Sequence, residues 1–278
     1  MKKVHYGEEG KFNALMKIIF ISLVILLLAI FMAMVGRGGG NFYVPVLIAA
    51  GAPMNVAATS AQLILMTTAL VATFVFHTYK AVDWKLALVI DPPTDIMAFV
   101  GGYFAHYFVG YHLKILFAIL LAIAAFFMLK PVKERINNGK KQFGYWNRSF
   151  GGTNYRVNLW MTIPITALVG FFAGMIGISG GSFKIPLMVL ACGVPVRIAI
   201  GTSSAMVAVT ALMGFAGHSI AGDFNPVWAI SLACVAALGG LVGGKISVKT
   251  APQRLKKIFA YTTLAAAVFM LVNALITE

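Results

Sequence analysis

Charged residues are scarce in this chain, and acidic residues are the scarcest of all. Of its 278 residues, 11% are charged and only 8 are Asp or Glu. A soluble domain of this size carries roughly a quarter charged residues, because its surface must be hydrated. The shortage excludes an ordinary soluble globular protein and indicates that much of the surface faces something other than water.

Cysteine is nearly absent, and the phosphate-binding glycine motif is missing. The 2 cysteines, Cys192 and Cys234, both lie in apolar segments. This placement excludes a disulfide framework and gives no reason to expect a metal site. The sequence contains no G-x-x-x-x-G-K-[ST] stretch, so nothing in it indicates ATP hydrolysis. We therefore expect neither a cofactor nor a metal.

Apolar runs long enough to cross a bilayer are abundant. About 20 apolar residues span the hydrocarbon core of a membrane. The runs predicted to be membrane segments are Ile18 to Val35, Val56 to Phe76, Leu86 to Phe108, Ile115 to Leu129, Leu159 to Ile178, Ala199 to Phe215, Val227 to Val242 and Ile258 to Ile276. The predicted fold class is therefore an all-α integral membrane protein.

Basic residues give the chain a formal net charge of +14. They crowd two loops between predicted membrane segments, residues 130–156 and 245–257. Such clusters mark the cytoplasmic side of a membrane protein. We interpret the charge as a signal of topology, so the expected partner is the lipid bilayer and not nucleic acid.

The sequence repeats itself with an offset of about 141 to 143 residues. Gly36 to Pro45 and Gly177 to Pro186 share the form G-x-x-G-G-[NS]-F-x-[VI]-P. A G-x-P turn, an [AG]-T-S triplet, a histidine and a Gly-Gly pair then follow in the same order in each half. The sequence predicts a first membrane repeat over 1–132, a basic polar linker over 133–156 and a second membrane repeat over 157–278.

A short apolar piece that contains a proline follows each glycine-rich turn, over Phe42 to Ala50 and Phe183 to Cys192. Ten helical residues cover about 15 Å, half of the hydrocarbon core. If these broken helices cross the membrane, each repeat has about five segments and the repeats are inverted. If they re-enter, each repeat has four spans and the repeats are parallel. The inverted arrangement places both basic loops in the cytoplasm, which favours it.

Short, interrupted segments at matching places in two halves indicate a transport site. A broken helix offers backbone N–H groups and a positive dipole end to an anion. The predicted substrate site comprises Gly39, Gly40, Asn41, Ser60, Gln62, Ser179, Gly180, Gly181, Ser182, Lys184, Thr202 and Ser203. The alternatives are that the glycines only allow close helix packing and that the hydroxyls bond to their own helices.

Charged residues stand in both breaks, Arg37 in the first and Lys184 in the second. A cation at this depth either attracts an anion or extends toward the lipid headgroups.

Two histidines, His77 and His218, close the next predicted helix of each half, close to Asp83 and Asp223. Such pairs could relay a coupling proton, and the alternative is a solvated position at the membrane interface. The sequence does not explain a further acidic pair, Asp91 and Asp95, which flanks two prolines.

Ser179 also fits a different chemistry. Gly177 to Gly181 matches the nucleophile pattern G-x-S-x-G, and His218 would be the base of an intramembrane serine hydrolase. In the first repeat the serine position is Gly38. Turn geometry explains the motif better than catalysis, so we expect no enzyme and keep the hydrolase as the alternative.

The duplicated turn with F-x-[VI]-P, followed by G-x-P and [AG]-T-S, resembles the sulfite exporter TauE/SafE family, also called the TSUP family. The resemblance runs from about Phe20 to the C-terminus and is closer in the second repeat. Arg37 stands where the family usually has an aliphatic residue, and Gln62 where an apolar one is common.

The resemblance implies a secondary transporter, an exporter or a permease, of small sulfur-containing anions such as sulfite, sulfonates or related organic acids. It implies the plasma membrane of a prokaryote, which in a Gram-negative bacterium is the cytoplasmic inner membrane. A gradient of protons or cations is then the expected source of energy.

Overall fold

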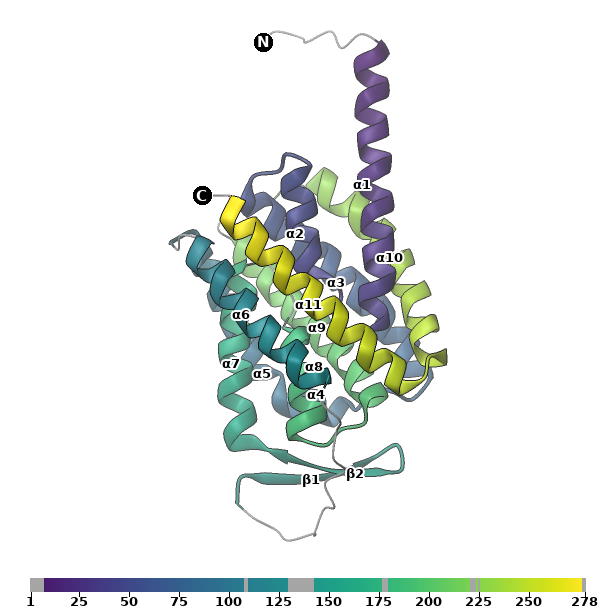
Figure 1. Cartoon of the computed structure of the whole chain (residues 1–278), viewed down its shortest axis with the longest axis vertical. Helices are drawn as coiled ribbons and strands as arrows, with labels where there is room; N and C mark the ends of the chain where they lie inside the picture. Colours follow the sequence, from purple (N-terminus) through teal and green to yellow (C-terminus); the bar gives the residue numbers. More distant parts are fainter. Residues whose placement is uncertain are drawn as a thin grey trace.

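The computed structural model describes residues 8–107, 110–129, 143–176, 180–220, 224 and 226–276, and these residues are almost entirely helical. In the first half the elements are α1 (Glu8–Met34), α2 (Gly40–Ala49), α3 (Met54–Thr78), α4 (Trp84–Ile90), α5 (Pro92–Phe104), the short 3₁₀ turn η1 (Ala105–Tyr107) and α6 (Gly110–Leu129). Figure 1 shows these helices packed with those of the second half in one bundle, from which the start of α1 projects.

A β-hairpin separates the two helical halves. Strands β1 (Tyr145–Phe150) and β2 (Thr153–Asn158) pair antiparallel, with Phe150 opposite Thr153. The described part of the predicted linker is therefore folded. The second half contains α7 (Leu159–Ile176), α8 (Gly181–Pro186), the π-helical turn η2 (Leu187–Ala191), α9 (Val196–Ile220), α10 (Pro226–Lys249) and α11 (Pro252–Ile276).

Among the described residues, five helices are long and apolar enough to cross a membrane, judged by length and composition. They cover Val56–Thr78, Leu159–Ile176, Val196–Ile220, Ala229–Lys249 and Pro252–Ile276, and shorter apolar helices cover Ile18–Met34 and Gly181–Ala191. The chain is thus a multi-pass membrane protein. The predicted run from Leu86 to Phe108 is not one of these helices.

This run is interrupted at Asp91, the first acidic residue within it. Helix α4 ends at Ile90, and α5 starts at Pro92. Pro92 and Pro93 have no N–H to donate to a preceding turn, but proline suits the first position of a new helix. The predicted span is therefore split into two shorter helices, with an acidic residue at the junction.

Buried apolar side chains gather around α3 and α9, which pack against each other at the centre of the bundle. The outer helices instead expose large apolar side chains, among them Phe20, Leu88, Phe126, Trp160 and Leu238. A surface of this kind is expected where helices face hydrocarbon, because lipid does not favour polar side chains.

The two halves interlock through matching glycine contacts. A Cβ at Gly101 in α5 would lie 2.1 Å from the carbonyl oxygen of Phe171 in α7. A Cβ at Gly243 in α10 would lie 2.2 Å from the carbonyl oxygen of Ile30 in α1. Because Gly101 and Gly243 are repeat partners, each half uses the same glycine to bring its helix against the first helix of the other half.

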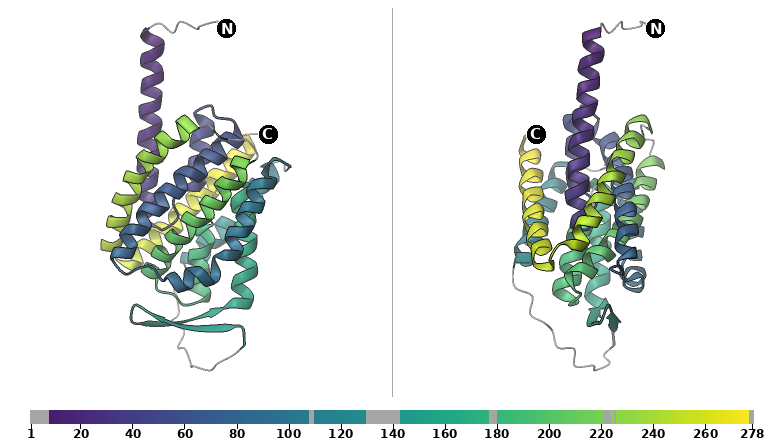
Figure 2. Two further views of the ribbon diagram at one scale, coloured as in Figure 1. Left: turned by 180° about the vertical axis from the view of Figure 1, so that it is seen from behind. Right: turned by 90° about the vertical axis from the view of Figure 1, so that its right-hand side faces the viewer.

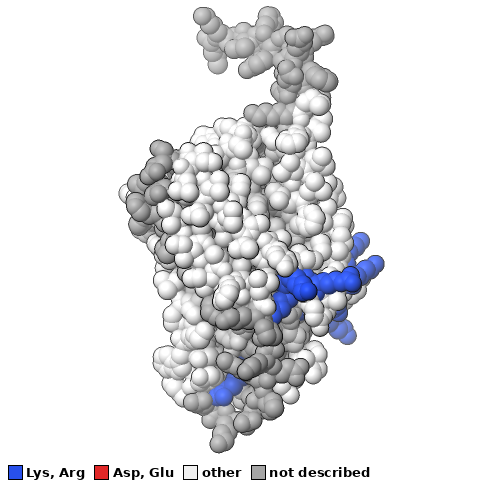
Figure 3. Space-filling view, in the orientation of Figure 1, with Lys and Arg blue, Asp and Glu red and all other residues white. Residues whose placement is uncertain are grey.

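The hairpin lies at one end of the bundle, and the start of α1 and the end of α11 lie at the other (Figures 1 and 2). Figure 3 shows Lys and Arg over the end where α10 passes into α11 and near the hairpin, while the rest of the described surface on this face is uncharged. Exposed basic residues at the α10–α11 turn are Lys245, Lys249, Arg254 and Lys257.

Candidate functional site

The first glycine turn and the start of α8 meet at one point on α9. The Ser203 hydroxyl on α9 donates to the carbonyl oxygen of Gly36 at 3.0 Å. A Cβ at Gly181 would lie 3.1 Å from Ser203 Oγ and 3.2 Å from the same Gly36 oxygen. Parts of the two breaks that are separated by about half the chain thus contact each other.

Glycine is required in the first turn for conformational and steric reasons. Gly36 and Gly39 have φ values of +69° and +99°, in the left-handed region that side chains disfavour. A Cβ at Gly36 would also lie 2.4 Å from the carbonyl oxygen of Ile200 on α9. At Gly36, the glycine therefore does allow close packing of the turn against α9, which was the alternative explanation for these glycines.

Neither short helix has a side-chain hydrogen bond from its N-cap residue, because both N-cap residues are glycines. The N-cap residues of α2 and α8 are Gly39 and Gly180. Gly40 and Asn41 begin α2, and Gly181 and Ser182 begin α8. Ser182 is buried. Ser179 lies outside the described residues, so its predicted place in the site stays a prediction.

The predicted polar donors of the following helices are all buried. Ser60 and Gln62 lie on α3, and the Gln62 Oε1 atom has no hydrogen-bond partner among the described residues. A Cβ at Gly214 on α9 would lie 2.7 Å from Gln62 Nε2, so the amide packs closely against α9. On α9, the Thr202 hydroxyl accepts from the backbone N–H of Asp83 at 3.0 Å.

Lys184 does not extend toward the headgroups. Its side chain is 1% exposed, and its ammonium group forms an ion pair with Asp91. Nζ also donates to Thr210 Oγ1 at 2.8 Å, and the Thr210 hydroxyl lies 2.8 Å from Asp95 Oδ1. Residues of the α4–α5 junction, α5, α8 and α9 together form a cluster of one ammonium and two carboxylates, in which Lys184 and Asp91 are buried and Asp95 is partly buried.

No role for Asp91 and Asp95 followed from the sequence, although a signal was present. An acidic residue on each side of a Pro-Pro pair, inside a run expected to cross the membrane, is costly unless a cation is near. The nearest cation in the fold, Lys184, is 93 residues from Asp91 along the chain. Sequence spacing therefore could not connect the two residues.

The position of the first repeat that corresponds to Lys184 carries no charge. Tyr43 corresponds to Lys184 in the aligned motif and is also fully buried. Its hydroxyl lies 3.3 Å from Thr68 Oγ1 on α3, as Lys184 lies beside Thr210 on α9. Helix α10, which carries the matching Gly-Gly pair, runs unbroken and has no acidic residue.

Arg37 is buried as well, with 1% of its surface exposed. Its Nη1 atom donates to Thr263 Oγ1 on α11 at 2.8 Å, and its Cζ lies 5.3 Å from the centre of the Phe259 ring. Its Nη2 atom has no hydrogen-bond partner among the described residues. The Arg37 side chain therefore does not extend toward the lipid headgroups, which was one of the two interpretations that the sequence allowed.

The two predicted coupling histidines have different surroundings. His77 is exposed and accepts a hydrogen bond from Trp84 Nε1 at 3.1 Å. His218 is buried, and its Nε2 lies 3.0 Å from the carbonyl oxygen of Gly174. Asp223 lies outside the described residues, so coupling through these histidines stays a prediction.

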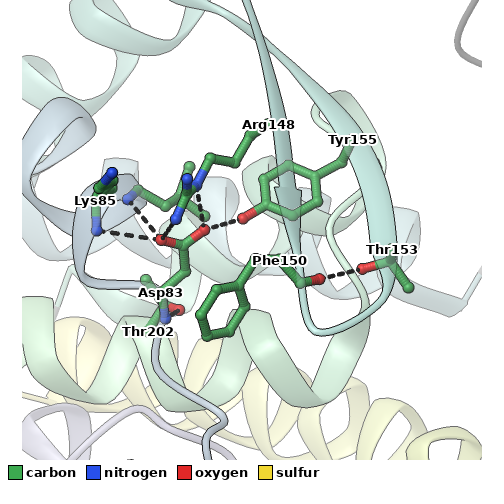
Figure 4. A network of polar contacts seen from close by, with 8 residues as sticks. Asp83, Lys85, Arg148, Phe150, Thr153, Tyr155 and Thr202 are labelled. Carbon is green, nitrogen blue, oxygen red and sulfur yellow. Dashed lines mark hydrogen bonds and ion pairs between the residues drawn. The ribbon is translucent and has the colours of Figure 1, made fainter.

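Asp83 connects the hairpin to the bundle (Figure 4). The Arg148 side chain binds both carboxylate oxygens at 2.9 Å, and the Tyr155 hydroxyl donates to Oδ2. Oδ1 also accepts from the backbone N–H of Lys85 and Leu86 and caps α4. The hairpin is thus attached to the start of α4 by this clamp. The backbone N–H of Asp83 itself donates to the Thr202 hydroxyl, which links this point to α9.

Burial alone would raise the pKa of the Asp83 carboxyl group. The hydrogen bonds from Arg148, Tyr155 and the Leu86 N–H outweigh this effect, so the pKa of Asp83 lies below its ordinary value. The same hydrogen bond to Asp83 raises the pKa of Arg148. Burial, with the bond to Asp83, raises the pKa of Tyr155. The clamp is therefore ionised on both sides at neutral pH.

Comparison with known proteins gives one consistent result. The family model for the sulfite exporter TauE/SafE matches residues 21–270. The chain is 28% identical over 228 residues to the probable membrane transporter protein YunE of Bacillus subtilis, which covers 78% of this chain and 84% of the relative. It is 22% identical over 278 residues to the probable membrane transporter protein MJ0441 of Methanocaldococcus jannaschii, covering 94% of this chain and 98% of that protein. No solved structure matches significantly.

Proposed function

This chain belongs to the sulfite exporter TauE/SafE family, and on that premise we propose that it transports small sulfur-containing anions such as sulfite, sulfonates or related organic acids. Transport across the membrane is what the family and its relatives support, and none of them supports the serine hydrolase. The observation that carries the proposal beyond the family is the contact of the two glycine breaks at Ser203.

The proposed substrate site lies where the breaks meet. Backbone N–H groups at the starts of α2 and α8 would bind an oxyanion there, and the proposed hydroxyl donors are Ser60, Thr202 and Ser203, all of which are buried. Hydrogen bonds are stronger in such a site than in water because the local dielectric is low. The Gln62 side chain adds a further donor. A half-turn of its amide group would exchange Oε1 and Nε2, so that an N–H group takes the place of the oxygen atom that has no partner among the described residues.

The hydrogen bond between Ser203 and Gly36 also suggests how access changes. It joins the first turn to α9, and a Cβ at Gly181 would meet both of these groups. We infer that the anion binds by replacing this internal contact, because the Ser203 hydroxyl cannot donate to Gly36 and to a substrate at once. The bond then holds the site closed when no substrate is present.

We further infer that Asp91, Asp95 and Lys184 bind the coupling proton. Two ionised carboxylates around one ammonium leave an uncompensated negative charge inside the bundle, which is costly. A proton on one carboxylate removes this charge. The elements packed around the cluster contribute Thr210 from α9, and α7 carries no titratable side chain. This cluster is a better candidate for coupling than His77, which is exposed.

The inverted arrangement remains part of the proposal. Its support is the reciprocal packing of α5 on α7 and of α1 on α10, and the position of the start of α1 and the end of α11 opposite the hairpin (Figure 1). The hairpin and the basic α10–α11 turn would then face the cytoplasm. Labelling of a cysteine placed at Ser149 from outside intact cells would overturn this orientation.

Purified protein in proteoliposomes tests the function directly. We expect uptake or release of sulfite or ethanesulfonate that a proton gradient accelerates, and a higher thermal midpoint in detergent with the same anions. Asp95→Asn should retain anion binding but lose the response to the proton gradient. Absence of flux and of stabilisation with sulfite, thiosulfate, ethanesulfonate and acetate would overturn the proposed substrate class.

A further inference from the structure

Among the described residues, two basic side chains, Arg37 and Lys184, are fully buried, and only Lys184 has a counterion there. Lys184 lies within hydrogen-bonding distance of Asp91, and Asp95 reaches it through Thr210. Arg37 has no carboxylate partner among the residues that the structure describes, and its Nη2 atom makes no hydrogen bond there. The positive charge of Arg37 is therefore left without compensation in this part of the chain.

The other described acidic residues lie elsewhere. Asp83 is held by Arg148 at the hairpin. Glu8 and Glu9 belong to the first turn of α1, whereas Arg37 follows its last turn, about 40 Å away along the helix. An unpaired guanidinium within a bundle is unfavourable, because burial removes its water without replacing it by an anion.

The contacts that Arg37 does make offset only part of this cost. The Thr263 hydroxyl is a neutral acceptor, and it already donates to the Phe259 carbonyl oxygen at 2.6 Å. The Phe259 ring lies in cation–π range of the guanidinium, at 5.3 Å. An apolar side chain would fill the same place without the penalty. The arginine therefore points to a ligand that supplies negative charge.

The position of Arg37 in the chain links that ligand to the site described above. Arg37 directly follows Gly36, whose carbonyl oxygen binds Ser203 and lies against Gly181. The glycines that follow it leave no open space: a Cβ at Gly38 would lie 2.3 Å from Leu65 Cδ1, and one at Gly39 2.5 Å from the Tyr43 ring, so a ligand reaches Arg37 only if these contacts shift. A guanidinium presents paired N–H groups that match two oxygens of one oxyanion, which an ammonium cannot do.

We propose that Arg37 is the residue that neutralises the transported anion, and that its free N–H edge binds two oxygens of a sulfite or sulfonate group. The inference rests on the proposed function, and it means that a residue of the first repeat binds the negatively charged group of the substrate. Lys184 of the second repeat then serves Asp91 and Asp95, the carboxylates of the first repeat, and Ser203 supplies a neutral donor.

Binding and thermal stability of Arg37 variants test the assignment. Arg37→Gln and Arg37→Met should weaken sulfite binding by at least roughly ten- to a hundredfold, as expected for loss of charge-assisted hydrogen bonds. In the absence of any anion, Arg37→Met should melt at a higher temperature than the wild type, because the unpaired charge is gone. The matched control is Arg197→Gln on α9, which removes an exposed arginine and should behave as the wild type.

The outcomes separate this inference from the proposed function. If sulfite stabilises the wild type and Arg37→Met equally, Arg37 does not bind the anion and the inference fails alone. A lower melting temperature of anion-free Arg37→Met would likewise show that the arginine serves the fold. If no anion stabilises the wild type, both ideas fail. Should the neutral variants not fold, Arg37→Lys decides: unchanged sulfite affinity contradicts paired binding by the guanidinium.

Discussion

The two halves of this protein share a backbone plan but differ in charge at the same position. In the first half, Tyr43 and Thr68 form a neutral contact between α2 and α3. In the second half, Lys184 and Thr210 make the corresponding contact between α8 and α9 and attract two carboxylates. Duplication thus preserved the broken helix while the chemistry beside it diverged.

The origin of the carboxylates makes the difference more informative. Asp91 and Asp95 belong to the first half, so the charged cluster exists only because the halves are interlocked. The neutral pair needs no residue from the other half. A transporter whose halves move relative to each other would strain the charged cluster but leave the neutral pair intact.

Breaking the charged cluster should have the largest effect on stability. Asp91→Asn removes the only carboxylate in direct contact with Lys184 among the described residues, because Asp95 reaches the ammonium through Thr210, and it should lower the free energy of unfolding by about 3–5 kcal/mol. The double variant Asp91→Asn, Lys184→Met should recover much of this loss, because neither charge remains. Unfolding in detergent, followed by circular dichroism, measures both. A fully stable single variant would show that Asp91 is not the counterion.

Filling the contact between the two breaks should have the next largest effect. A Cβ at Gly181 would lie 2.9 Å from Val207 Cγ2, and valine adds two further carbons. Gly181→Val should abolish sulfite binding and cost about 1–3 kcal/mol through overpacking. At Gly180 a Cβ would meet nothing closer than 3.4 Å, so Gly180→Ala is the control for folding. Wild-type affinity in Gly181→Val would place the substrate elsewhere.

Removing the hydroxyl that joins the breaks should affect binding more than folding. Ser203→Ala deletes a donor to the anion, worth about 1.5–3 kcal/mol, or roughly ten- to a hundredfold in affinity. Ser204→Ala is the matched control, because Ser204 is also buried and donates to the Ala69 carbonyl oxygen at 3.2 Å, on α3. Equal losses in the two variants, read by thermal shift with sulfite, would argue against a specific role for Ser203.

The hairpin clamp should respond to pH. The pKa of Asp83 is lowered in the folded protein, so its ionised contacts stabilise the fold above its ordinary value of about 4 and are lost as the pH falls through the lowered value. The gap in thermal midpoint between the wild type and Asp83→Asn should be widest at neutral pH and narrow in acid. A constant gap would show that the carboxylate charge does not hold the hairpin.

The smallest effect is expected at the neutral pair. Tyr43→Phe removes a hydroxyl contact of 3.3 Å, while Thr68 keeps its bond to the Ile64 carbonyl oxygen at 2.7 Å. The loss should be about 1 kcal/mol or less. A loss as large as that of Asp91→Asn would remove the contrast between the halves.

The sequence alone predicted the features that depend on local composition. Long apolar runs indicated membrane helices, and α3, α7, α9, α10 and α11 have the required length and composition. The glycine and proline signals placed the breaks before α2 and α8, because these residues adopt or forbid particular backbone angles wherever they occur. The family followed from the same motifs.

Side-chain partners could not be predicted in this way. Lys184 and Arg37 look alike in the sequence, each a cation in a glycine-rich break, and both could have reached the headgroups. The fold gives Lys184 two acidic neighbours from α4 and α5, and gives Arg37 only Thr263 and Phe259 among the described residues.

The physical reason lies in the range of each effect. Hydrophobic length and backbone preference act within a few neighbouring residues, so they can be read along the chain. The energy of a buried charge depends on which groups lie within a few ångströms, and helix packing brings these together from 93 residues away for Lys184 and 226 for Arg37. The sequence by itself predicted that the chain spans a membrane in two related halves, and only the tertiary structure decided which of the two buried cations pairs with a carboxylate among the described residues.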